Sequence, residues 1–113
     1  MFTEIKKLHK MLEEANIPHE YMKRLNGLAV SYPKNKGFIC DAVIAQDPGD
    51  SRYKSFGYDE GLIEIQGLLT PEEEKEGHED PYYGGTIHGV AGWLTADDVF
   101  NRIKTDWESR KEN

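Results

Sequence analysis

Two carboxylates on separate apolar segments are the residues of this sequence that could support metal-dependent hydrolysis. Asp41 lies within the apolar segment 38–46, and Glu64 lies within the segment 62–66. On neighbouring strands, two carboxylates can hold Mg²⁺ while a nearby lysine polarises the attacking water. Gln66 stands where such a nuclease needs that lysine, and the usual Pro-Asp pair before the strand is missing. A nuclease is therefore a minor alternative, and it requires Asp41 and Glu64 to converge on one face.

Other catalytic and metal-binding motifs are incomplete. Possible metal ligands gather at His78, Glu79, Asp80 and His88, but they form no HExxH or paired-cysteine pattern. His9 has no partner at ligand spacing, so we expect it to be an exposed surface histidine. The Gly84-Gly85 pair lacks the lysine and hydroxyl of a phosphate-binding loop, and no GxSxG sequence is present. We therefore predict no catalytic residue, no metal site and no cofactor.

A basic and aromatic group lies in the predicted loop 47–60. Arg52, Tyr53 and Lys54 are consecutive, and residues of these types can stack a nucleobase and hold a phosphate. The alternative is that the aromatic side chains only attach the loop to the sheet. We therefore keep Arg52, Tyr53 and Lys54 as candidate ligand-binding residues, with a small nucleotide as the candidate ligand.

The second predicted loop, 72–85, is strongly acidic. Its first nine residues contain six carboxylates and one lysine, and so they supply −5 of the net charge of −7. Such a run is usually a solvated surface, but it can also mimic nucleic-acid phosphates and attract a basic partner. The candidate partner-binding residues in and after this run are Glu72, Glu73, Glu74, Glu76, Tyr82, Tyr83 and His88.

Length and composition indicate one soluble domain. The chain has 113 residues, of which 37% are hydrophobic and 31% charged. No apolar run approaches a membrane span, and no secretory signal is recognisable at the N-terminus. Cys40 is the only cysteine, which favours a cytoplasmic location. The net charge of −7 argues against generic nucleic-acid binding, which needs a basic surface.

Helices are predicted near both ends of the chain. In residues 3–15 the apolar side chains recur at helical spacing, with Thr3 as the expected N-cap and Asn16 in the left-handed position after the helix. The predicted stripe consists of Ile5, Leu8, Leu12 and Ala15. A second helix begins after Thr95, with Asp98 completing a capping box. Its predicted buried stripe consists of Val99, Phe100, Ile103 and Trp107.

Four or five strands are predicted between these helices. Residues 20–25 and 28–32 form a hairpin around Asn26-Gly27, with the first strand at an edge. Residues 38–46 are the most apolar segment and should be a central strand in which Cys40 is a small buried side chain. Further strands are expected at 62–66 and within 86–94, and a helical turn should begin after Thr70 and Pro71.

The element order predicts an α+β fold: an antiparallel sheet of four to five strands flanked by N- and C-terminal helices in a two-layer sandwich. Both helices should cover one face. The loops 47–60 and 72–85 leave opposite ends of strand 62–66, so we do not expect them to form one site within a monomer. A two-fold homodimer could bring them together, with Trp93 and Trp107 as interface or core residues.

Four segments resemble a group of small, mostly uncharacterised phage and prophage proteins of Gram-positive gut bacteria. They are residues 61–73 (GLIEIQGLLTPEE), 92–100 (GWLTADDVF), 8–13 (LHKMLE) and 17–20 (IPHE). Compared with that group, segment 77–90 looks like an insertion. The group has no established activity, so the resemblance implies no catalytic residues.

The resemblance implies an accessory role in a bacterial host. The leading hypothesis is a non-catalytic phage-type protein that antagonises a host defence protein or complex through an acidic and aromatic surface. One alternative is a nucleotide-binding sponge that acts as an oligomer. The other is the metal-dependent nuclease, of PD-(D/E)xK type.

Overall fold

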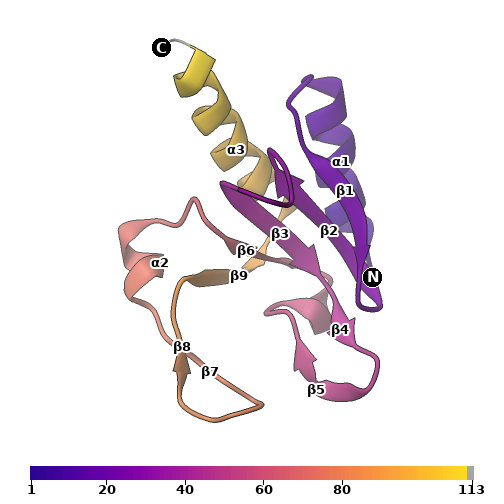
Figure 1. Cartoon of the computed structure of the whole chain (residues 1–113), viewed down its shortest axis with the longest axis vertical. Helices are drawn as coiled ribbons and strands as arrows, with labels where there is room; N and C mark the ends of the chain where they lie inside the picture. Colours follow the sequence, from indigo (N-terminus) through magenta and orange to yellow (C-terminus); the bar gives the residue numbers. More distant parts are fainter. Residues whose placement is uncertain (112–113) are drawn as a thin grey trace.

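A five-stranded antiparallel sheet forms the centre of the computed structural model, which describes residues 1–111 (Figure 1). Its strands are β1 (Glu20–Arg24), β2 (Gly27–Tyr32), β3 (Cys40–Ile44), β6 (Ile63–Gln66) and β9 (Val90–Leu94). They are arranged in the order β1-β2-β3-β6-β9, and every neighbouring pair is antiparallel. The predicted fold class, the edge position of the first strand and the central position of β3 are therefore confirmed.

Two helices, α1 (Thr3–Glu14) and α3 (Ala96–Lys111), cover one face of the sheet (Figure 1). The main core lies between them and the sheet, and it includes Ile5, Leu8, Leu12, Val30, Ala42, Ile65, Val99 and Ile103. The Tyr32 hydroxyl donates a hydrogen bond of 2.7 Å to Asp106, which joins β2 to α3. Within residues 1–111, no helix has the length and apolar character needed to cross a membrane.

Capping chemistry sets the helix boundaries, largely as predicted. Short helix α2 (Pro71–Lys75) begins with a complete capping box between Thr70 and Glu73. At the start of α3, the Asp98 amide donates to the Thr95 hydroxyl over 3.2 Å. The prediction for Thr3 is wrong, because Phe2 occupies the N-cap of α1 and makes no side-chain cap.

The end of α1 also differs in one detail from the prediction. Asn16 has a φ of 55°, and the Ile17 amide bonds back to the Leu12 carbonyl, which closes the helix as expected. Ala15 is already the C-cap and is exposed, so it does not extend the buried stripe. Trp107 and Phe100 of α3 are half-buried and pack against the core.

The turn between β1 and β2 lies one residue earlier than predicted. Arg24 pairs with Gly27, so the two turn residues are Leu25, with a φ of 53°, and Asn26. Gly27 is instead required inside the strand, because a Cβ there would lie 2.0 Å from the Ile44 carbonyl oxygen. Close contact with β3, rather than turn geometry, therefore explains this glycine.

Two short hairpins extend from the sheet at the lower end of the molecule in Figure 1. The first arm, residues 46–54, contains β4 (Gln46–Asp47) and β5 (Asp50–Lys54), and a short 3₁₀ turn, η1 (Tyr58–Glu60), follows it. The second arm, residues 78–87, contains β7 (His78–Glu79) and β8 (Thr86–Ile87). The segment predicted as loop 47–60 is thus largely a hairpin, which its polar and glycine-rich sequence concealed.

Candidate binding groove between two arms

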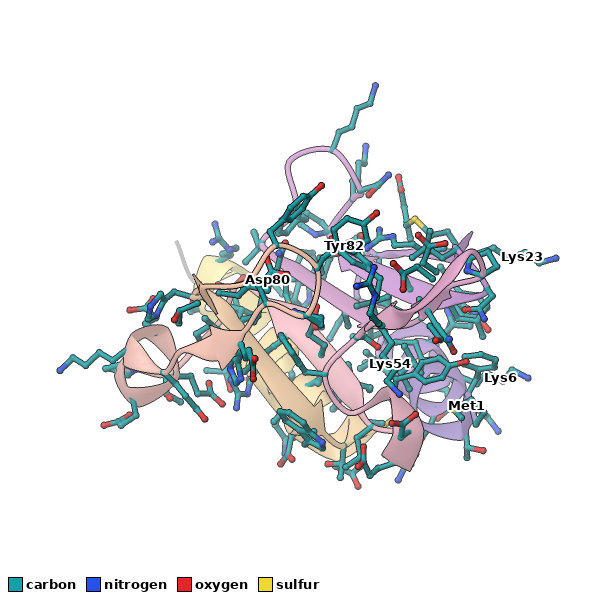
Figure 2. The ribbon with its side chains drawn as sticks, turned by 90° about the horizontal axis from the view of Figure 1, so that it is seen from below. Met1, Lys6, Lys23, Lys54, Asp80 and Tyr82 are labelled. Atoms are coloured by element: carbon teal, nitrogen blue, oxygen red, sulfur yellow. The ribbon has the colours of Figure 1, made fainter. Side chains whose placement is uncertain are left out.

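The two arms meet over the sheet face that the helices leave uncovered. The rings of Tyr53 on the first arm and Tyr82 on the second pack edge to face, with 5.5 Å between their centroids. The Arg52 guanidinium lies 5.5 Å from the Tyr82 ring centroid, and Tyr83 packs 4.8 Å from Tyr82. Figure 2 views the molecule from the end that carries the arms, and it labels Lys54 of the first arm and Asp80 and Tyr82 of the second. The expectation that the two segments need a homodimer to meet is therefore wrong.

A groove of about 440 Å³ lies between the arms and the sheet. Its floor includes Asp41 and Val43 of β3 with Glu64 and Gln66 of β6, and its walls include Tyr53, Lys54, Asp80 and Tyr83. The register explains the floor: Asp41 pairs with Gln66 and Val43 with Glu64, so these four side chains share one face. The groove therefore combines polar groups on a rigid sheet with aromatic side chains on the arms.

An ion pair occupies part of the floor. One Asp41 oxygen accepts a hydrogen bond from Arg24 and the other accepts one from Ser31, each at 2.5 Å. Asp41 and Glu64 therefore lie on one face, as a nuclease would require, but the arginine cation already neutralises Asp41. Gln66, directly opposite Asp41, cannot supply the positive charge of a lysine.

Glu64 is the second acidic group of the floor, and its environment disfavours its charge. Burial raises the pKa of this carboxyl, and the neighbouring Asp41 raises it further, whereas a hydrogen bond from the Phe56 amide lowers it. That amide lies 2.9 Å from a Glu64 oxygen. Perturbed carboxyls of this kind are commoner at functional sites than elsewhere.

An aromatic cluster fixes the base of the arms. Phe56 stacks on His78 with 4.7 Å between ring centroids and on Trp93 with 5.8 Å. The Phe56 carbonyl also accepts a hydrogen bond of 3.2 Å from the Trp93 amide. His78 Nε2 is the one buried side-chain nitrogen or oxygen in residues 1–111 that lacks a hydrogen-bond partner. Trp93, half-exposed, thus stabilises the arms, whereas Trp107 packs on the main core.

Acidic neighbours hold the cations of the first arm. Arg52 makes two side-chain contacts with Asp50, of 2.9 and 3.1 Å, and these hydrogen bonds lower the pKa of Asp50. Lys54 lies 2.7 Å from Asp59. Positive charge at this side of the groove is therefore largely compensated within the chain.

The acidic residues predicted to bind a partner divide into two groups. Glu72, Glu74 and Glu76 are exposed on and beside α2, and His88 is exposed after β8. Glu73 instead bonds Arg102 of α3 through both oxygens, at 2.6 and 2.9 Å, and these hydrogen bonds lower its pKa to about 2. None of these five residues lines the groove.

Two features of the structure went unnoticed in the sequence. The first is the ion pair of Arg24 with Asp41. Arg24 lies in a strand with weak alternation of apolar and polar residues, and this pattern does not predict the pair. His9 is half-buried and lies 2.8 Å from His19, and Glu13 is one helical turn away. The prediction that His9 lacks a partner at ligand spacing is wrong, because the i, i+4 relation to Glu13 is such a spacing.

Cys40 lies in the interior of the protein as a free thiol. The side chain is buried in the main core, and burial raises the pKa of its thiol to about 12. The thiolate, which is the reactive form, is therefore strongly disfavoured. This agrees with the prediction of a small buried apolar side chain.

Comparisons with protein-family models, curated protein sequences and solved structures find no match to this chain.

Proposed function

We propose that this chain is a non-catalytic binding protein that holds a positively charged segment of a partner protein between its two arms. The observation that carries this proposal is the contact of Tyr53 with Tyr82 above the uncovered sheet face. Because the arms come from different parts of the chain, their meeting creates a concave surface that neither would form alone. Concave surfaces with aromatic walls and few convergent polar groups are typical of binding sites.

The charges of the groove favour a cationic ligand. Its cations, Arg24 and Lys54, each pair with a carboxylate. Two further carboxyl groups, Glu64 and Asp80, line the groove outside these ion pairs, and exposed glutamates of α2 and β7 add negative charge nearby. A lysine or arginine side chain entering here would gain attraction from these carboxylates without displacing an existing ion pair.

The aromatic walls favour the same ligand. Tyr53 is 50% exposed and Tyr83 is 85% exposed, so both rings are accessible. A guanidinium or ammonium group over a tyrosine ring is attracted by the ring's negative face. Arg52 already lies over Tyr82 in this manner, which gives an intramolecular example of the contact that we propose for the partner.

The resemblance to phage proteins makes a host protein or complex, such as a defence protein, the expected partner. Occupying a basic segment of that partner would block whatever the segment normally binds. The groove is complete within one chain, so this action requires no homodimer.

A nucleotide remains the second candidate, because the groove volume of about 440 Å³ lies in the range of small-ligand pockets. Tyr53 and Tyr83 could stack a base. Phosphate binding would, however, require Arg24 or Lys54 to leave its carboxylate partner. The nucleotide is therefore the less favoured ligand.

Peptide display followed by NMR titration tests the proposal. Random peptides selected on the wild-type chain should be enriched in arginine and lysine, and they should shift the amide resonances of the arms and of β3 and β6. Replacing Tyr53 and Tyr83 together by serine should weaken binding about tenfold or more. The control is Phe38→Ser, which removes an exposed aromatic ring outside the groove.

Two results would contradict the proposal. One is a shift map that lies away from the groove, or a double tyrosine variant that binds as tightly as the control. The other is binding of mononucleotides or cyclic dinucleotides in the groove while basic peptides fail to bind, which would establish the second candidate instead.

A further inference from the structure

Three side chains that no part of the groove uses converge at the end of α1. His9 and Glu13 lie one turn apart on the helix, and His19 lies just before β1. His9 Nδ1 is 2.8 Å from His19 Nε2, and His9 Nε2 is 3.5 Å from a Glu13 oxygen. One ligand atom from each residue lies within 4.8 Å of the other two. In residues 1–111, no other three His, Cys, Asp or Glu side chains meet that criterion.

The backbone holds these residues together independently of any ligand. Asn16, in the left-handed conformation, reverses the chain directly after α1. Ile17 is buried in the core, and its amide bonds to the Leu12 carbonyl over 3.0 Å. The chain therefore returns along the last turn of the helix, and His19 comes to lie beside His9.

The two imidazoles are also oriented in advance. His19 Nδ1 lies 2.8 Å from the Ile17 carbonyl oxygen, so Nδ1 donates its proton there, and the Nε2 lone pair accepts a hydrogen bond from His9 Nδ1. Metal-binding histidines typically donate their second nitrogen to such a carbonyl. The His9 ring stacks on Tyr21, with 4.1 Å between centroids and 10° between planes. To share an ion, His9 Nδ1 must release its proton and the two rings must tilt so that both lone pairs point at the metal, while the Ile17 carbonyl keeps His19 in the required tautomer.

We propose that His9, Glu13 and His19 bind a divalent transition-metal ion, with Zn²⁺ as the reference ion. Two imidazoles and one carboxylate match the ligand preferences of zinc, with a water completing four-coordination. Zinc–nitrogen distances of about 2.0–2.1 Å place two ligand nitrogens roughly 3.4 Å apart in a tetrahedron. The facing nitrogens, now 2.8 Å apart, need separate only slightly. The exposed Glu13 side chain can rotate to supply its oxygen.

The proposed ion would join α1 to the edge of the sheet. Tyr21, which stacks on His9, belongs to β1, and His19 leads directly into that strand. Within residues 1–111, strand β1 lies at the edge of the sheet and pairs with β2 alone. Metal binding should therefore stabilise this edge, and it does not depend on what the groove binds.

Isothermal titration with ZnCl₂ alone, combined with thermal unfolding, tests the site. We expect one ion per chain and a rise in the unfolding temperature of roughly 10 °C at a hundredfold excess over Kd. His19→Asn should abolish this binding, and Glu13→Gln should weaken it by about tenfold or more. The matched controls are His88→Asn, at an exposed histidine, and Glu14→Gln, at the neighbouring exposed glutamate. Both controls should bind zinc like the wild-type chain.

Imidazole NMR of the wild-type chain gives a second readout that does not require the variants to fold. Zinc should shift the ring-nitrogen resonances of His9 and His19 while those of His78 and His88 stay unchanged. The proposal is overturned if zinc fails to bind, if it shifts His78 or His88 instead, or if folded His19→Asn retains wild-type affinity.

Discussion

The charge of Glu64 should reduce the stability of the fold and strengthen the binding of a cationic ligand in the groove. Burial raises the pKa of its carboxyl, so folding disfavours the charged form. A raised carboxyl pKa means that stability declines as the pH rises through the folded-state value. The charged form of Glu64 therefore costs stability, in a groove for which we propose a cationic ligand.

Replacing Glu64 by glutamine should consequently separate the two properties. The amide oxygen can still accept the Phe56 hydrogen bond, so we expect Glu64→Gln to be at least as stable as wild type at pH 7 in urea unfolding. The same variant should bind a selected basic peptide less tightly. Glu60→Gln, at an exposed position outside the groove, should change neither property. A loss of more than about 1 kcal/mol in Glu64→Gln would show that the charge is stabilising.

Glu73 should show the opposite dependence on pH. Its hydrogen bonds with Arg102 lower its pKa from 4.5 to about 2, so its contribution is complete above pH 5 and is lost as the pH falls towards 2. The contribution amounts to about 3 kcal/mol. In urea unfolding between pH 7 and pH 3, Glu73→Gln should lose stability less steeply than wild type. Glu72→Gln, at the exposed neighbour, should follow the wild-type curve, and an equally flat curve for it would contradict the assignment.

Substitution of Gly27 tests the close packing of strand β2 against strand β3, because it adds one Cβ atom between them. A Cβ at this position would lie 2.0 Å from the Ile44 carbonyl oxygen, and strands β2 and β3 cannot separate without breaking their ladder. We expect Gly27→Ala to reduce the free energy of unfolding by about 3 kcal/mol. Gly49→Ala, in the turn of the first arm, meets only a side-chain oxygen at 3.4 Å and should be nearly neutral. Equal effects of the two substitutions would contradict this explanation of Gly27.

Among the helices, strands and turns, the features that the sequence predicted correctly depend on residues close to one another along the chain. The capping boxes at Thr70 and Thr95, the left-handed Asn16 and the apolar strand β3 depend on neighbours close in sequence, and all were recognised. The hairpin turn was misplaced because Asn26-Gly27 is a strong turn signal, whereas Gly27 serves contact with Ile44, a residue distant in sequence.

The candidate groove was predicted only in part, for the same reason. The composition identified Tyr53 and Tyr82 as candidates, but their contact joins two hairpins that leave opposite ends of β6. The spacing of apolar and polar residues along the chain does not predict a contact between two separate hairpins. The pairing of Arg24 with Asp41 likewise depends on strand register, which the sequence pattern left open.

The tip of the second arm should be dispensable for folding and necessary for binding. In residues 80–85, the backbone hydrogen bonds of Asp80 are with Gly84 and Gly85, within the tip itself. Replacing these six residues by Asn-Gly keeps a two-residue turn between β7 and β8. We expect the unfolding temperature to change by less than about 4 °C and binding of a selected peptide to be lost. Unchanged binding would place the ligand elsewhere.

At the scale of the whole molecule, the two proposed sites lie on opposite sides of the sheet. Both helices lie on one face of the sheet, and His9 and Glu13 belong to helix α1, whereas the floor of the groove is the opposite face (Figure 1). The sheet separates them, so occupancy of one site need not affect the other. The groove is formed within a single chain, whereas the sequence had suggested that a two-fold dimer would bring the two segments together.

The meeting of the two arms within one chain is the central claim, and a nuclear Overhauser measurement between the Tyr53 and Tyr82 rings tests it most directly. With ring centroids 5.5 Å apart, we predict clear ring–ring signals in a uniformly labelled sample. They should disappear from an isotope-filtered spectrum of mixed labelled and unlabelled chains, which detects only contacts between chains. Ring–ring signals that are absent, or that survive in the filtered spectrum, would contradict a groove formed by a single chain.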